Sequence, residues 1–220
     1  MIHERYRRDY IGEFILVETL LSNNATIQRR EWVDNPVENH HISGRAVVMA
    51  DRFKRGGFTH RRLEKHQGGL LATKSLQTYG TGDLWRDMRF DFFLLQDPAQ
   101  INELKSQQYH EKSIVYSTTR LCINNPGCFY PVPYQPPMDA LAQTIYLAAF
   151  DGHREIFLLS YHKDLPAGTA NWANDVDLVI KTYPGTKFYN IGYTAVPPQW
   201  TNNSNFEIMD FRKFVSYCDI

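Results

Sequence analysis

The sequence predicts a doubly wound, Rossmann-like α/β fold with a mostly parallel sheet and an appended N-terminal β-hairpin. From residue 45 onward, short and nearly continuous apolar runs alternate with segments of helical periodicity, a pattern typical of parallel strands buried on both faces. The composition, 43% hydrophobic and 22% charged over 220 residues, fits one globular domain. We therefore expect a single domain over residues 1–220, with the hairpin and a connector at 1–44 and a Rossmann-like core at 45–220.

The expected elements follow in order along the chain. The hairpin joins residues 10–19 to 25–33 through the turn-prone SNN at 22–24, and a polar connector containing a proline follows. The apolar runs predict strands at 46–50, 70–78, 91–96, 113–118, 154–161 and 187–193. The periodic segments predict helices at 98–108, 138–150, 172–183 and 206–215. Ligands of such sheets bind beyond the carboxyl ends of the strands, so the loops that follow each strand are the places to seek a site.

Cysteine usage and hydropathy exclude several classes. Cys122, Cys128 and Cys218 form no CxxC pair, and no histidine or cysteine spacing matches a zinc motif, so we expect free thiols and no metal. The N-terminus reads MIHERYRRDY, without an apolar signal region, and no apolar run approaches the length of a membrane span. The sequence therefore predicts a soluble protein of the cytoplasm, or of the host cytoplasm if a phage encodes it.

A basic loop follows the first strand of the core. Residues 45–74 contain eight Lys and Arg against two Asp and Glu, although the whole chain is neutral. In this loop Gly56 and Gly57 would let the backbone approach an anion, and Arg52 and Lys54 would offer charge-assisted hydrogen bonds to it. The alternative is a turn whose charges are only solvated.

Polar side chains near two further strand ends could contact a nucleotide. Lys74, Gln77 and Tyr79 suit the edges of a base or ribose, or else they belong to a hairpin-like turn. Asp97, at the end of the run DFFLLQ and before Pro98, could bind a ribose hydroxyl or cap the next helix.

Two residues could act as a general base on an acceptor hydroxyl. Asp139 lies at the start of a strong helix, where capping is the alternative role. His162 ends the run REIFLLSYH, where a structural role is the alternative. The loop after it has the composition of a mobile lid and ends at Trp172, which could stack on a base or sugar.

Three stretches resemble a known family. FDGHREIFLLSYH, NDVDLVIKTYPGTKFYNIGYTAVP and FFLLQDPAQINEL are similar to segments of a Rossmann-like glycosyltransferase family that includes bacterial sialyltransferases and motility-associated glycosyltransferase-like proteins. The resemblance covers roughly residues 45–198. It implies a phosphate loop at 52–57, a base and ribose wall at 74–79, and a sugar-facing Asp97. The chain departs from the family in having ADRFKRGG in place of the G-N-G-P-S turn, and Trp172 in the region of the lid histidine.

The resemblance and the candidate residues together lead to one expected function and its alternatives. We expect a metal-independent glycosyltransferase that moves a sugar from a nucleotide-sugar donor to a hydroxyl acceptor and needs no other cofactor. For a phage-encoded enzyme, hydroxymethylated DNA is a natural acceptor, and basic residues at 5–8 and 45–74 could track its backbone. The alternatives are a non-catalytic module that binds a nucleotide or nucleic acid, and a structural protein that assembles through its hairpin.

Overall fold

The computed structural model describes residues 3–11, 14–20, 27–34, 44–52, 54–55, 58–65, 76–162, 165, 171–193 and 195–220. The chain divides into two compact units, Met1–His40 and His41–Ile220, where the sequence predicted a single domain. The boundary lies within the predicted polar connector. Each unit is described by itself below.

The first unit is a three-stranded antiparallel sheet. Its strands are β1 (His3–Ile11), β2 (Phe14–Leu20) and β3 (Ile27–Asp34), paired in the order β1-β2-β3. The predicted hairpin corresponds to β2 and β3, and its turn at 22–24 lies outside the described residues. The prediction missed β1, because arginines and acidic residues in HERYRRDYI obscure the apolar alternation of a strand.

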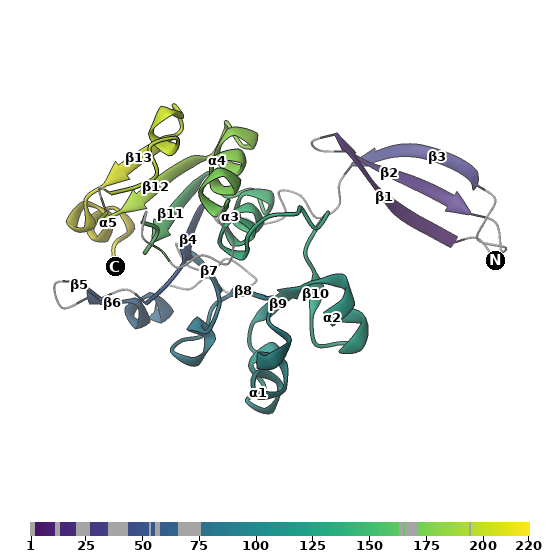
Figure 1. The fold of residues 1–220 in the computed structure, drawn as a ribbon, viewed down its shortest axis with the longest axis horizontal. Helices are drawn as coiled ribbons and strands as arrows, with labels where there is room; N and C mark the ends of the chain where they lie inside the picture. Colours follow the sequence, from purple (N-terminus) through teal and green to yellow (C-terminus); the bar gives the residue numbers. More distant parts are fainter. Residues whose placement is uncertain are drawn as a thin grey trace. The chain divides into compact units, whose positions relative to one another are not determined.

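The second unit contains an eight-stranded sheet whose neighbouring strands are all parallel (Figure 1). The order across it is β10-β9-β8-β7-β4-β11-β12-β13. The strands are β4 (Arg45–Met49), β7 (Gln77–Thr81), β8 (Phe92–Leu95), β9 (Ile114–Ser117), β10 (Tyr130–Pro131), β11 (Glu155–Leu159), β12 (Lys187–Ile191) and β13 (Phe206–Met209). From β4 the chain runs outward to β10, returns beside β4 as β11, and runs outward again to β13. The predicted doubly wound fold is confirmed, and its topological switch point lies between β4 and β11.

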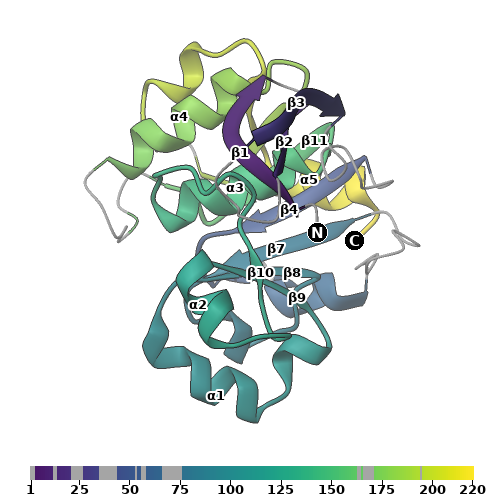
Figure 2. The same cartoon turned by 90° about the vertical axis from the view of Figure 1, so that its right-hand side faces the viewer.

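Helices cover the sheet on both faces. The helices are α1 (Ile101–Ser106), α2 (Thr119–Asn124), α3 (Ala140–Phe150), α4 (Trp172–Thr182) and α5 (Phe211–Cys218), with 3-10 turns between other elements. Side by side, α3 and α4 cover the face to which Ala46 and Val48 belong (Figure 2). Val47 and Met49 alternate to the other face, where α1, α2 and α5 contribute to a second apolar cluster. The central strand is therefore buried on both sides, which explains its uninterrupted apolar sequence.

Two predicted elements are placed differently by the structure. The strand predicted at 70–78 is β7 at Gln77–Thr81, and residues 70–75 lie outside the described part. The helix predicted at 206–215 is the strand β13 followed by α5, because Asp210 caps the helix by accepting a hydrogen bond from Arg212 N at 2.8 Å. The short elements α2 and β10 were not predicted.

The described helices and the three cysteines can be compared with the sequence predictions. Within the described ranges, no helix combines the length and the hydropathy needed to cross a membrane. The three cysteines are free, and burial raises the pKa of the Cys218 thiol to about 12.

Gly80 marks a point where the sheet has no room for a side chain. A methyl group placed there would lie 2.8 Å from the ring of Phe90, which is fully buried and cannot move freely. We expect Gly80→Ala to lower the free energy of unfolding by about 1–3 kcal/mol, as overpacked core substitutions do. Urea denaturation measures this change. Gly185→Ala is the control, because an added methyl group would meet no atom within 4 Å, and an equal loss in the two variants would contradict the prediction.

Candidate functional site

The loops after β4 and β11 meet at the switch point. The backbone N–H of Ala50 donates to the Leu159 carbonyl at 3.1 Å, and the Ser160 hydroxyl lies 3.4 Å from the Arg52 carbonyl. Ser160 has a φ of 64°, a left-handed conformation that costs free energy in a residue other than glycine. The two loops are therefore held together at the sheet edge where Rossmann-like folds bind ligands.

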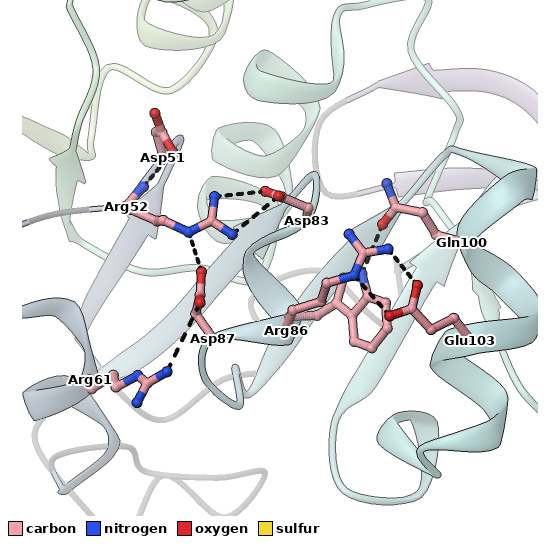
Figure 3. A network of polar contacts seen from close by, with 9 residues as sticks. Asp51, Arg52, Arg61, Asp83, Arg86, Asp87, Gln100 and Glu103 are labelled. Carbon is pink, nitrogen blue, oxygen red and sulfur yellow. Dashed lines mark hydrogen bonds and ion pairs between the residues drawn. The ribbon is translucent and has the colours of Figure 1, made fainter.

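Arg52 lies at this edge, but carboxylates of the chain already bind it (Figure 3). Its Nη1 and Nη2 atoms donate to the two carboxylate oxygens of Asp83 at 3.3 and 3.1 Å, and its Nε atom pairs with Asp87. These contacts raise the pKa of Arg52, first through the hydrogen bond to Asp83. Both acidic residues flank the 3-10 helix Leu84–Arg86 that follows β7.

The local charge differs from what the sequence predicts. Arg61 is the second cation of this group, with its Nη2 4.0 Å from Asp87. Asp83 and Asp87 supply two carboxylates against these two guanidiniums, so the charges of these ion pairs balance. The basic stretch 45–74 is thus partly neutralised by residues that lie outside it in the sequence.

A second ion pair of similar geometry lies next to this group. Arg86 donates to Glu103 in α1 through Nε at 2.9 Å and Nη2 at 2.5 Å, and this hydrogen bond lowers the pKa of Glu103. The Arg86 guanidinium also lies 4.8 Å from the Trp85 ring, whose Nε1 donates to Gln100. These contacts join the turn after β7 to α1.

Asp139 is a buried helix cap. It is 5% exposed, and its Oδ1 accepts a hydrogen bond from Leu141 N at 2.9 Å. Its own backbone N–H donates to Asp175 in the first turn of α4, also at 2.9 Å. The capping interpretation therefore accounts for Asp139, and the N-terminus of α3 is occupied by a carboxylate of the chain itself.

His162 lies at the carboxyl edge, as predicted. It follows β11 and is only partly buried, with its ring 5.0 Å from that of Tyr193 after β12. The preceding Tyr161 is fully buried and donates its hydroxyl to the Leu141 carbonyl at 3.0 Å, which fixes the backbone before His162. Among the described residues, no side chain forms a hydrogen bond with the His162 ring.

Gln77 and Tyr79 lie within β7 and not after it, so the prediction that they form a ligand wall at the strand end is wrong. Both are fully buried. The Tyr79 hydroxyl donates to Asp151 Oδ2 at 2.6 Å and lies 2.9 Å from His153 Nε2. Desolvation by burial raises the pKa of Tyr79 well above its ordinary value. These contacts give Tyr79 a structural role.

Asp97 and Trp172 also have structural contacts. Asp97 caps the 3-10 helix Pro98–Gln100 by accepting from Ala99 N at 2.9 Å, which is the alternative role that the sequence left open. Trp172 is 7% exposed and packs edge-on against Trp200, with the ring centroids 5.4 Å apart. It is therefore not placed to stack on a ligand, and the predicted stacking role is wrong.

The remaining predicted ligand residues cannot be compared with the structure. Lys54 belongs to the short strand β5 (Lys54–Arg55), whose side chains are not described. Gly56, Gly57 and Lys74 lie outside the described residues, as does most of the predicted lid at 163–171.

The sequence did not single out Asn190, which lies near the end of β12. It is fully buried; its Nδ2 donates to the Tyr193 carbonyl at 2.9 Å, and its Oδ1 has no hydrogen-bond partner within the described part of the chain. A buried acceptor without a donor lowers the free energy of unfolding by about 1–3 kcal/mol, unless water or a ligand donates a hydrogen bond to it. An asparagine in the apolar run KFYNI was the available signal.

Neither a search for metal ligands nor a comparison with known proteins assigns a role to further residues. In the described residues, no group of three or more His, Cys, Asp or Glu side chains could hold a metal ion. Models of known protein families give no match to the chain, and neither do curated protein sequences.

Proposed function

We propose that the chain is a glycosyltransferase that binds a nucleotide sugar across the carboxyl ends of β4 and β11. One observation carries the proposal: the switch point brings Arg52, after β4, and His162, after β11, to the same sheet edge through loops that hydrogen-bond to each other. Clefts at such points are the usual ligand sites of open parallel sheets. A guanidinium suits a departing phosphate and an imidazole suits proton transfer.

In this proposal His162 is the general base. It would remove the proton of the acceptor hydroxyl as that oxygen attacks the anomeric carbon, and the bond from this carbon to the phosphate oxygen would break. A positioned base typically contributes about 10²–10⁴-fold to the rate. Asp139 is less suited to this role, because it is buried and its Oδ1 already caps α3.

A second candidate is a binding module without catalysis. It is favoured by the observation that two positively polarised features of the described part of this edge, Arg52 and the N-terminus of α3, are engaged by carboxylates of the chain. Such a domain would capture a nucleotide or the end of a nucleic acid without transferring a group.

Incubation with nucleotide sugars separates the two candidates. The purified chain would be mixed with UDP-, GDP- and CMP-sugars and with either small glycans or hydroxymethylated DNA, and the acceptors analysed by mass spectrometry. A mass increase of one sugar residue supports the transferase. Thermal stabilisation by nucleotides without any transfer supports the binding module, and the absence of both effects refutes both candidates.

A further inference from the structure

The Arg52 guanidinium is engaged on two sides by carboxylates, as Figure 3 shows. Asp83 accepts from both terminal nitrogens, and Asp87 pairs with Nε. We infer that Asp83 and Asp87 form an ionic latch that holds Arg52 in the ligand-free protein and has to release it before Arg52 can bind a nucleotide phosphate. This inference rests on the proposed function, since it concerns the regulation of the same site.

In this geometry the carboxylates compete with a phosphate for the N–H donors of Arg52. A guanidinium binds carboxylate and phosphate through the same planar fork of N–H donors. The fork formed by Nη1 and Nη2 is occupied by Asp83, with distances of 3.3 and 3.1 Å, and the Nε–H lies against Asp87. A phosphate can therefore accept two parallel hydrogen bonds from Arg52 only after it displaces a carboxylate.

The charge of the group leads to the same conclusion. Asp83 and Asp87 neutralise Arg52 and Arg61, which reduces the attraction of these guanidiniums for an approaching anion. The side chains of Arg52 and Asp83 are each 47% exposed, and exposed ion pairs of this kind are weak enough to exchange. A ligand of higher charge competes better, so the latch would favour a nucleoside diphosphate over a monophosphate.

The test is a gain of affinity on removal of the latch. UDP would be titrated by calorimetry at low ionic strength into the wild-type chain and into Asp83→Asn and Asp87→Asn. Asparagine keeps the shape of the side chain and one acceptor oxygen for Arg52, but it removes the charge and the second acceptor. We expect UDP to bind Asp83→Asn about fivefold more tightly, the upper range for an exposed ion pair, and to bind Asp87→Asn more tightly than the wild-type chain as well. The gain should be larger for UDP than for UMP.

Two control variants make the result specific. Glu103→Gln removes the same charge from the neighbouring Arg86 pair and should change UDP affinity by less than about twofold, because screening in water weakens the more distant charge. Adding Arg52→Ala to Asp83→Asn should abolish the gain, since the latch acts only through Arg52.

The outcomes separate this inference from the proposed function. If UDP binds the wild-type chain and the latch variants equally, or if Glu103→Gln gives the same gain, the latch is refuted and the nucleotide site stands. A gain that persists without Arg52 also refutes the latch. If UDP binds none of the proteins, the titrations are repeated with GDP and CMP, and both the latch and the proposed function fail if none of the three nucleotides binds.

Discussion

Replacing His162 by glutamine should reduce sugar transfer by at least about 10²-fold and leave the free energy of unfolding nearly unchanged. Glutamine keeps a polar side chain of similar reach, but it cannot accept a proton at neutral pH. His162 is only partly buried, and its main described contact is the ring of Tyr193, so the fold does not depend on its imidazole. Initial rates with the donor and acceptor identified by mass spectrometry measure the effect.

Two variants serve as controls for His162→Gln. His110→Gln makes the same change just before β9, at the opposite end of the sheet, and should keep normal turnover. Asp139→Asn retains the oxygen that caps α3, and near-normal activity is expected because Asp139 has no catalytic role in the proposal. If Asp139→Asn loses turnover while His162→Gln does not, the base has been assigned to the wrong residue.

The buried contact of Tyr79 with Asp151 and His153 is expected to give the largest stability effect. Asp151→Ala should lower the free energy of unfolding by about 3 kcal/mol, because it leaves the buried Tyr79 hydroxyl, which also contacts His153, without its charged acceptor. Tyr79, Asp151 and His153 are at most 3% exposed, so water cannot easily replace the lost hydrogen bond. Chemical denaturation monitored by tryptophan fluorescence gives the value.

Asp97→Ala is the matched control for this network. It removes an exposed capping carboxylate and should lower the free energy of unfolding by about 1 kcal/mol or less. Tyr79→Phe completes a double-mutant cycle with Asp151→Ala, and the combined loss should be clearly smaller than the sum of the two single losses. Equal losses in Asp151→Ala and Asp97→Ala, or a strictly additive cycle, would show that the network contributes little.

Most of the parallel sheet can be predicted from the sequence, because its strands are buried on both faces. AVVMA and the IFLL of REIFLLSY are apolar without interruption, and both runs form strands within about two residues of the predicted bounds. β7 was misplaced because Gly80 and the following Gly82 resemble a turn, although Gly80 lies inside the strand where the Phe90 ring needs space. Local sequence does not reveal that packing requirement.

The site is less accessible to sequence reasoning, because the contacts that define it join distant residues. The position of His162 followed from the rule that strands of a parallel sheet present their carboxyl ends at one edge. The partners of Arg52 did not follow, since Asp83 lies 31 residues further along the chain. Asp139 and Asp97 were each given two roles, and the structure shows the capping role in both cases. Capping depends on neighbouring backbone N–H groups and is therefore encoded locally.

The central position of β4 has a consequence for folding kinetics. Its partner strand β11 pairs Arg45 with Glu155, 110 residues later, so half of the ladder of β4 requires closure of a very long loop. High contact order of this kind slows folding. On a ribosome that adds about 5–20 residues per second, β11 emerges roughly 5–20 s after β4. Throughout that interval the edge of β4 that later pairs with β11 has no partner strand. The nascent chain therefore exposes an apolar segment of the kind that chaperones bind.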